Sequence, residues 1–207
     1  MNSPGRLITL EGGEGAGKST HARFIRQWLT GKGREVVLTR EPGGSPLAEA
    51  VREIVLRKWD EGVTPATEVL LMFAARSAHV HATIRPALAA GRDVVCDRFV
   101  DSSYAYQGGG QGFPLAHLQA LEAMVLGDLQ PDLTIVCDLD PALGLARTRS
   151  RGEQNRFEEE TAAYMQRVRA AFLKRAQANP RRYAVVDASR TLEQVQAELV
   201  KLLETRL

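Results

Sequence analysis

Residues 12–19 read Gly12-Gly13-Glu14-Gly15-Ala16-Gly17-Lys18-Ser19. They match the G-x-x-x-x-G-K-[ST] pattern of a phosphate-binding loop, whose backbone N–H groups cradle phosphate oxygens. In such a loop the lysine reaches the β- and γ-phosphates, and the serine hydroxyl ligates Mg²⁺. An apolar run at 7–10 predicts a strand before the loop, and helical periodicity follows from Ser19 onward. The order of strand, loop and helix favours a nucleoside triphosphate site over a chance glycine-rich turn.

Apolar runs recur along the chain and predict further strands. The runs are continuous rather than alternating, which is typical of strands buried on both faces of a parallel sheet. We therefore predict the α/β class, with a parallel five-stranded sheet, helices on both faces and three layers. The predicted strands lie near residues 6–11, 35–39, 93–97, 132–138 and 183–187.

Local signals mark the helices between these strands. Ser45, which precedes a proline, predicts a helix N-terminus, and Thr191 with Gln194 predicts a capping box. Pro86 is expected to kink or divide a long apolar helical segment over 65–91. Two glycine-rich stretches interrupt the pattern and are expected to be irregular, 41–44 and 107–112.

Composition narrows the class of protein. The 207 residues are expected to form one domain, 1–207, that buries a substantial core. The net charge of +2 gives no bulk electrostatic case for nucleic-acid or membrane partners. Cys96 and Cys137 each lie in an apolar run without metal-ligand spacing, so we expect buried, reduced thiols. Because the sequence shows neither a secretory signal nor a run of transmembrane length, we expect a cytoplasmic protein.

Asp97 and Arg98 end the third predicted strand, at the same sheet edge as the phosphate loop. Asp97 is placed to hold Mg²⁺ through water beside Ser19, and Arg98 is placed to bind an anionic acceptor. The alternative is a charged pair that only caps the strand end. We favour the functional interpretation because phosphoryl transfer next to this edge needs both charges.

A second charged segment, 147–156, is rich in arginine and contains Gly152. An arginine at the transferring phosphoryl group accelerates transfer by orders of magnitude. Taken alone, this segment is more simply a solvated basic helix end. The glycine suggests a mobile flap over about 147–157.

Several motifs occur in an order that is more specific than the phosphate loop alone. They are EGGEGAGKST (11–20), TREPGG (39–44), LLMFAAR (70–76), CDRF (96–99), DSSYAYQGGG (101–110), GDLQPDLT (127–134) and RGEQNR (151–156). Together they resemble the bacterial thymidylate kinase (dTMP kinase) family, of the phosphate-loop nucleoside monophosphate kinases. The likeness covers nearly the whole chain. It implies the fold of those kinases and a homodimer that phosphorylates dTMP to dTDP with MgATP, in dTTP biosynthesis.

The resemblance also implies roles for individual residues. ATP contacts are implied for Gly12, Gly13, Glu14, Gly15, Ala16, Gly17, Lys18, Ser19, Thr20 and Arg147. Contacts to the acceptor nucleotide are implied for Glu14, Glu41, Pro42, Arg52, Phe73, Arg76, Asp97, Arg98, Ser103, Tyr106 and Gln107. In the family, the Glu14 position contacts the 3′-hydroxyl, and Arg52 and Arg98 clamp the acceptor phosphate with Gln107 nearby. The Arg76 and Ser103 positions face the base, and Tyr106 crowds the 2′ carbon.

Two positions depart from the commonest family pattern. Many members place a stacking Phe four residues before the base-reading arginine, where this chain has Met72, and Phe73 is three before. We expect Phe73 to face the base, with Met72 as the alternative. Some members carry an arginine at the position of Gly15, whereas this chain resembles those with the arginine in the flap. We therefore expect Lys18, Arg98 and Arg151 to be catalytic, although another flap arginine remains an alternative to Arg151.

Rival functions make different demands on the sequence. A deoxynucleoside kinase needs a carboxylate base for the 5′-hydroxyl and usually reads Glu-Arg-Ser at the third strand end, where this chain reads Asp97-Arg98-Phe99. A non-catalytic nucleotide switch would carry a guanine-reading Asn-Lys-x-Asp motif, which is absent from the sequence. Another nucleoside monophosphate kinase remains the nearest alternative. The sequence favours ATP and dTMP as partners, with no nucleic acid or membrane.

Overall fold

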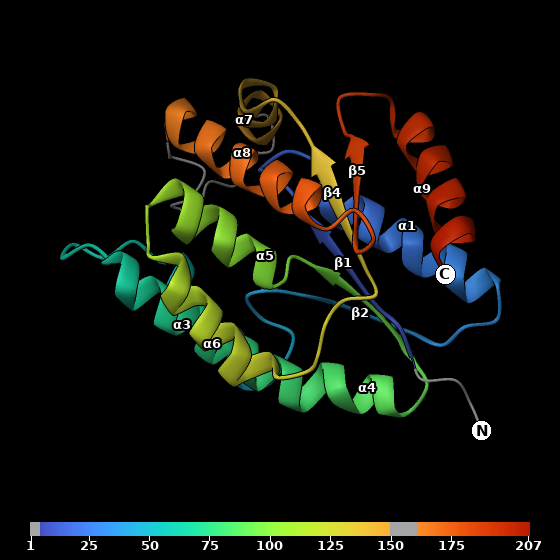
Figure 1. Ribbon diagram of the computed structural model, residues 1–207, viewed down its shortest axis with the longest axis horizontal. Coiled ribbons are helices and arrows are strands. Elements are labelled where there is room, and N and C mark those ends of the chain that lie inside the picture. The colour runs from blue at the N-terminus through green and yellow to red at the C-terminus, as the bar shows by residue number, and fades with distance from the viewer. Residues whose placement is uncertain (1–4, 150–160) are drawn as a thin grey trace.

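Five parallel strands form the centre of the molecule in the computed structural model, which describes residues 5–149 and 161–207 (Figure 1). The sheet order is β2-β3-β1-β4-β5, and every neighbouring pair is parallel. The strands are β1 (Leu7–Glu11), β2 (Val36–Arg40), β3 (Asp93–Asp97), β4 (Leu133–Asp138) and β5 (Tyr183–Asp187). Each begins and ends within one residue of the predicted range.

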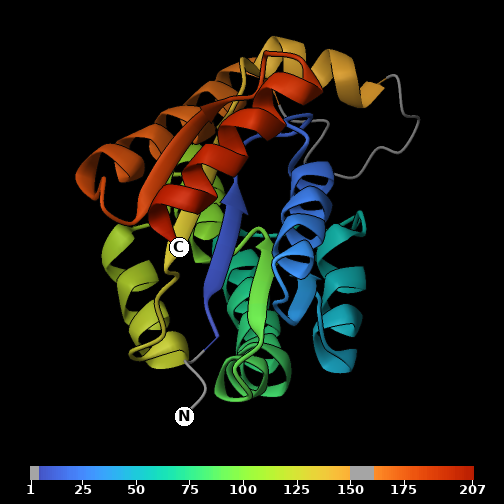
Figure 2. The same ribbon diagram turned by 90° about the vertical axis from the view of Figure 1, so that its right-hand side faces the viewer.

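Helices cover both faces of this sheet, which confirms the predicted layers (Figures 1 and 2). The helical elements are α1 (Lys18–Gly31), α2 (Pro46–Leu56), α3 (Pro65–His79), η1 (Val80–Ile84), α4 (Arg85–Ala89), α5 (Val100–Ser103), η2 (Tyr104–Gly110), α6 (Leu115–Leu126), α7 (Pro141–Arg149), α8 (Ala162–Ala178) and α9 (Leu192–Arg206). One core joins α1 and α9 to the sheet, and the other face packs against α3, η1, α4, α6 and α8. In the described part of the chain, no helix is both long and apolar enough to cross a membrane.

The continuous apolar runs bury both faces of the central strands. Along β1, Ile8 and Leu10 enter the core under α1 and α9, while Leu7 enters the core under α3 and α6. Polar side chains inside the sheet are paired, since the hydroxyl oxygens of Thr9 and Thr134 lie 2.9 Å apart. The edge strands β2 and β5 are only partly buried, so burial on both faces is limited to the central strands.

The predicted helix signals are found where the sequence places them. Ser45 accepts a hydrogen bond from the N–H of Ala48 at the start of α2. Thr191 and Gln194 form a reciprocal capping box at α9. Pro86 lies in the first turn of α4, after the π-helical turn η1 that separates it from α3.

The expectation of irregular chain through 107–112 is wrong for its first four residues. Gln107 and the glycines up to Gly110 belong to the π-helical element η2. These glycines let η2 approach α8 closely, because a Cβ on Gly109 would lie 2.6 Å from the Cβ of Ala171. A Cβ on Gly110 would likewise lie 2.6 Å from the ring of Tyr164. Glycine here permits helix packing rather than a loop.

Candidate active site at the carboxyl edge of the sheet

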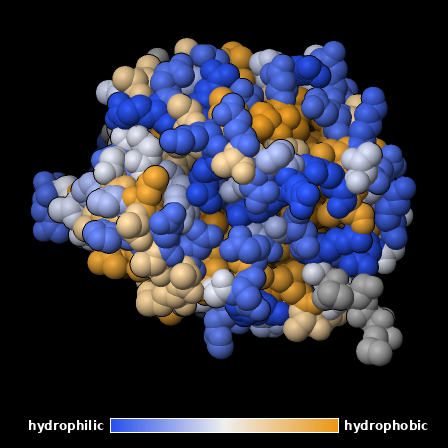
Figure 3. Space-filling model, in the orientation of Figure 1, coloured by the Kyte–Doolittle hydropathy of each residue, from blue (hydrophilic) through white to orange (hydrophobic). Residues whose placement is uncertain are grey.

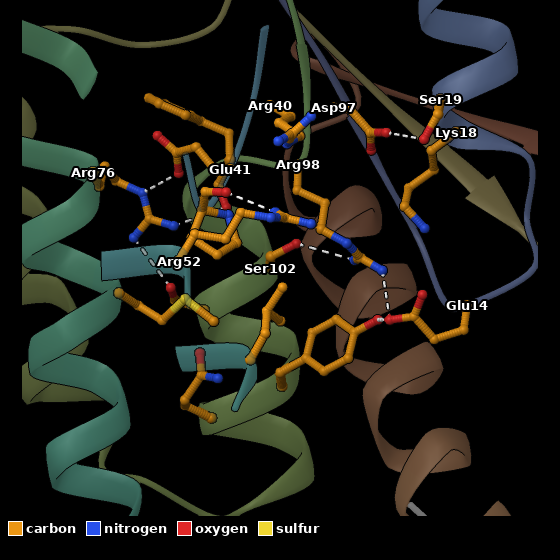
Figure 4. Close-up of a pocket in the computed structure, with 17 residues that line it drawn as sticks. Glu14, Lys18, Ser19, Arg40, Glu41, Arg52, Arg76, Asp97, Arg98 and Ser102 are labelled. Carbon is orange, nitrogen blue, oxygen red and sulfur yellow. Dashed lines mark hydrogen bonds and ion pairs between the residues drawn. The ribbon is translucent and has the colours of Figure 1, made fainter. Parts of the chain in front are cut away.

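A cavity opens where β1, β3 and β2 end, which is where ligands bind in parallel α/β sheets (Figure 4). Its walls come from the phosphate loop and from segments after β2, on α2 and α3, and after β3. The lining residues are Glu14, Lys18, Ser19, Arg40, Glu41, Pro42, Arg52, Leu56, Met72, Arg76, Asp97, Arg98, Phe99, Ser102, Ser103, Tyr106 and Gln107. All the residues predicted to contact the acceptor are among them, except Phe73.

The phosphate loop owes its shape to glycine at positions that other residues rarely adopt. Gly15 and Gly17 have φ of 72° and 77°, in the left-handed region. A Cβ on Gly15 would also lie 2.3 Å from the carbonyl oxygen of Gly144 in α7. An arginine at position 15 would therefore be strained by the backbone angle, and its Cβ would clash with the neighbouring helix. Lys18 begins α1, and its Nζ donates to the Gly13 carbonyl at 2.7 Å, arching over the loop.

Ser19 and Asp97 lie together at the phosphate-loop end of the cavity, where the Ser19 hydroxyl donates to the Asp97 carboxylate (Figure 4). A hydroxyl and a carboxylate are the oxygen ligands that Mg²⁺ prefers, usually with several waters retained. The donor set therefore fits the predicted metal.

Arg98 occupies the centre of the cavity, with Lys18 and Ser19 on one side and Arg76 on the other (Figure 4). Its backbone φ of 69° is the only positive φ of a non-glycine residue in the described chain. Such left-handed backbone in a non-glycine residue is costly and persists where the surroundings fix it. Here the guanidinium donates to the Gly12 carbonyl at 2.9 Å and to the Glu14 carboxylate at 2.8 Å. The side chain is thus held between the phosphate loop and the acceptor side.

The cavity is positively charged overall. Five cationic side chains line it against three carboxylates, which leaves an excess of two positive charges. Arg52 is anchored by donating to the Pro42 carbonyl at 2.7 Å. Burial and the nearby charge of Arg40 both lower the pKa of Arg52. The site therefore holds cations close together, and an anionic group such as a phosphomonoester relieves their repulsion.

Glu14 is the carboxylate that faces this cationic group. Burial alone would raise the pKa of Glu14, but the charges of Arg98 and Lys18 outweigh it and lower the pKa below its ordinary value. The Tyr106 hydroxyl also donates to Glu14 at 3.0 Å. The carboxylate is therefore ionised at pH 7 and accepts hydrogen bonds.

Arg76 forms the far wall with most of its guanidinium fixed by the protein. Its Nε donates to Glu41 at 2.7 Å, Nη1 to the Ser103 hydroxyl at 3.1 Å, and Nη2 to the Phe99 carbonyl at 3.1 Å. Each terminal nitrogen carries a second hydrogen beyond these bonds, and Arg76 lines the cavity. Arg76 and Ser103 are therefore joined by a hydrogen bond, and both line the cavity.

The expected position of Phe73 is wrong. Phe73 is 2% exposed and packs in the core beneath α3, with the Arg76 guanidinium 4.7 Å from its ring centroid. Met72 lines the cavity instead. Successive residues on a helix point about 100° apart, so residues 72 and 73 face different directions, and the bulkier ring takes the buried one.

The remaining predicted residues lie at the edges of the site. Gln107 donates to the buried carboxylate of Glu68 while still reaching the cavity wall. Thr20 lies in the first turn of α1, one residue after Ser19. Arg147, on α7, donates to the Ala188 carbonyl at 3.0 Å and reaches toward the Gly15 carbonyl at 3.5 Å. Arg151 and most of the predicted flap lie outside the described residues.

Sequence reasoning missed several side chains that build this site. Arg40 and Ser102 line the cavity, and Glu11 supports it from below. Glu11 accepts from the Phe99 N–H at 2.8 Å and from the Ser102 hydroxyl at 2.6 Å, which fixes the turn that carries Arg98. Arg40 ends β2 and Glu11 ends β1, so the strand-end rule that identified Asp97 identifies both.

Comparisons with known proteins agree with this geometry. The family model described as thymidylate kinase matches residues 10–199. A thymidylate kinase of Pseudomonas fluorescens (strain SBW25) is 55% identical over 203 residues, covering 98% of this chain and 97% of that protein. A thymidylate kinase of Pseudomonas syringae pv. tomato is 54% identical over 199 residues, covering 96% and 95%. The crystal structure of thymidylate kinase from Ehrlichia chaffeensis superposes with a TM-score of 0.78 at 33% identity, covering 97% of this chain and 99% of that one.

Proposed function

Because this chain belongs to the thymidylate kinase family, we propose that it transfers the γ-phosphoryl group of MgATP to dTMP and releases ADP and dTDP. One observation carries the assignment of this reaction to the cavity. The phosphate loop and the acceptor-type residues Arg52, Arg76 and Arg98 line the same space. A donor phosphate and an acceptor phosphate can therefore meet in line within it.

The protein's task in this reaction is to position two anions and to neutralise their charge. Lys18 binds the β- and γ-phosphates, and Arg52 with Arg98 binds the phosphate of dTMP. That phosphate is already an anionic nucleophile at pH 7, so no strong general base is required. Ser19 and Asp97 would hold Mg²⁺, which would supply positive charge next to the phosphoryl group being transferred.

Selection of the acceptor depends on the far wall. Arg76 and Ser103 hydrogen-bond the edge of the thymine ring, and Met72 covers its face. Glu14 accepts from the 3′-hydroxyl, and Tyr106 crowds the 2′ carbon so that a ribose is disfavoured. Each role uses the side chain's own chemistry at a position that borders the cavity.

The alternatives fit the site less well. A deoxynucleoside kinase must deprotonate a neutral hydroxyl, yet Asp97 is engaged by Ser19, and Glu14 accepts from both Arg98 and Tyr106. A nucleotide switch binds no phosphate acceptor, so its function would not require Arg52 and Arg76 at the wall opposite the phosphate loop. The family membership favours neither of them.

We further propose that the chain acts as a homodimer in the cytoplasm. Exposed apolar side chains gather on α2, α3 and α6, where α3 packs against both of the other helices. They are Leu47, Ile54, Leu70, Leu115 and Met124. Figure 3 shows apolar side chains among hydrophilic ones over the region of α3 and α6. Burial of such a surface against a second copy stabilises a dimer, and the buried, unpaired Cys96 and Cys137 suit a reducing compartment.

A coupled ADP-release assay against a panel of nucleoside monophosphates and thymidine tests the proposed function. We expect dTMP to give the highest kcat/KM and thymidine to give no ADP above background. Equal turnover of all monophosphates would remove the base-reading role of Arg76. Faster turnover of thymidine would identify a nucleoside kinase instead.

A further inference from the structure

Behind Arg76 lies a series of buried hydrogen bonds between polar side chains, and the proposed reaction gives this series no role. The second oxygen of Glu41 lies 3.0 Å from Nδ1 of His79, and Nε2 of the same ring lies 2.7 Å from the Thr39 hydroxyl. Glu41 and Arg76 are 5% and 3% exposed, and His79 is fully buried. This series of hydrogen bonds begins at Thr39 on β2, passes through His79 on α3 to Glu41, and ends at the Arg76 guanidinium, which faces the cavity. Figure 4 shows its last step, from Glu41 to Arg76.

Hydrogen-bond roles in this series follow from the partners. A carboxylate only accepts, so His79 donates from Nδ1 to Glu41. In a neutral imidazole Nε2 then accepts, and the Thr39 hydroxyl donates to it. Every link therefore points toward Glu41, which in turn accepts from Nε of Arg76. Buried polar groups joined in this way fix one another's orientation.

The backbone at Gly44 packs closely against His79 and Thr39. A Cβ on Gly44 would lie 2.4 Å from Nε2 of His79 and 2.4 Å from the Thr39 hydroxyl oxygen. Gly44 also has a φ of 85°, in the left-handed region. Gly44 therefore makes room for the His79 imidazole and the Thr39 hydroxyl, which any larger residue at this position would displace.

We propose that His79 is a positioning residue for recognition of the acceptor base. It holds the Glu41 carboxylate in place, Glu41 holds Nε of Arg76, and the outer N–H groups of Arg76 are thereby aimed at the base. This inference rests on the proposed base-reading role of Arg76. A residue that only packs α3 against β2 would affect stability and both substrates alike, so the two roles differ in what a variant does to each KM.

Kinetics of a matched set of variants tests the proposal. His79→Leu removes both hydrogen bonds, His79→Asn keeps a donor where Nδ1 lies, and His81→Asn is the control, because His81 is exposed on η1. We expect His79→Leu to raise the KM for dTMP roughly tenfold with kcat and the KM for ATP within about twofold. His79→Asn should recover most of the loss, and His81→Asn should match the wild type.

Thr39→Val keeps the inference testable where His79→Leu does not fold. It removes only the donor to Nε2, and we expect a smaller rise in the KM for dTMP, about threefold. An equal rise in the KM for dTMP and in the KM for ATP would overturn the proposal. Wild-type kinetics in the His79→Leu variant would also overturn it. The wild-type assay separates the two claims, since an enzyme that ignores dTMP refutes the proposed function before any variant is compared.

Discussion

At the scale of single residues, Tyr106 combines two properties that substitutions can separate. The residue is 5% exposed and lines the cavity proposed for the acceptor, its ring centroid lies 5.0 Å from the Arg98 guanidinium, and its hydroxyl donates to Glu14. We predict that Tyr106→Ala improves the relative use of the ribonucleotide acceptor over dTMP, because the bulk is gone. Tyr106→Phe is the matched control, which keeps the ring and should keep the wild-type ratio. The ratio of kcat/KM for the two acceptors is the measurement, and an unchanged ratio in Tyr106→Ala would exclude a steric gate.

Glu11 makes stability depend on pH. Burial, together with the charge of Asp101, raises the pKa of Glu11 to about 8 from an ordinary 4.5. Between these values the folded protein binds a proton that the unfolded chain releases. The stability that the folded protein gains from protonated Glu11 is therefore fully present below about pH 4.5, and it is lost as the pH rises through the folded-state pKa of about 8.

Glu11→Gln tests this linkage, since the amide oxygen can still accept from the Phe99 N–H while the side chain no longer titrates. We predict that the variant gains stability relative to the wild type as the pH rises from 5 to 9, by on the order of a few kcal/mol. Thermal unfolding of both proteins across this range gives the difference. A Tm difference that stays constant with pH would mean that Glu11 does not titrate there.

Arg151 tests where the catalytic arginine lies. An arginine at position 15 would meet Gly144, so an arginine that joins Lys18 at the transferring phosphoryl group has to come from another segment. We predict that Arg151→Ala lowers kcat by ~10²-fold or more with little change in the KM for ATP, and that Arg151→Lys rescues it poorly. Arg149→Ala and Arg156→Ala are the comparison variants. Normal kcat in Arg151→Ala, with collapse in a neighbour, would move the role to that neighbour.

A single residue could be predicted from the sequence when a local motif or a strand end specifies its position. Lys18, Asp97 and Arg98 were predicted because the loop motif and the strand ends specify them. Phe73 was misplaced because residues 72 and 73 both border the arginine-bearing face, and only packing beneath α3 decides which one is buried. His79 carried no signal, since its partners Thr39 and Glu41 are about forty residues away.

At the scale of elements, the helix that carries Tyr106 depends on its contact with α8. The contact includes Gly109 against Ala171, and on the preceding helix α5 the buried carboxylate of Asp101 accepts from Arg175 on α8. We predict that Gly109→Ala destabilises the fold by about 1–3 kcal/mol, because the new methyl group overlaps Ala171. Gly31→Ala in α1 is the control, since its methyl group would meet no atom within 4 Å and should be neutral or slightly stabilising. Denaturant unfolding measures both, and equal stabilities would show that η2 and α8 yield to the added methyl group.

Most elements were predictable because their signals are local. Continuous apolar runs identified all the strands of the described sheet, and caps at Ser45 and Thr191 identified helix starts. The helical stretch η2 was not predictable, because three consecutive glycines disfavour a helix locally. Close packing against α8, more than fifty residues later in the chain, outweighs that preference.

At the scale of the whole molecule, sheet order is what assembles the site. β1 lies beside β3, and β3 lies beside β2, so the chain segments after residues 11, 40 and 97 meet at one edge. The phosphate loop, Glu41 and Arg98 are far apart in sequence and become neighbours only through this order. The two proposed phosphate sites therefore share one cavity, as the proposed reaction requires.

Transfer of a labelled phosphoryl group tests the proposed reaction most directly. The protein is incubated with Mg²⁺, ATP labelled in its γ-phosphoryl group, and equal concentrations of dTMP and thymidine, and the products are separated by chromatography. We predict that the label leaves ATP and appears in dTDP in equal amounts, with none in dTMP formed from thymidine. Label found in free phosphate or in dTMP, with no dTDP, would show that the cavity does not transfer phosphoryl groups to dTMP.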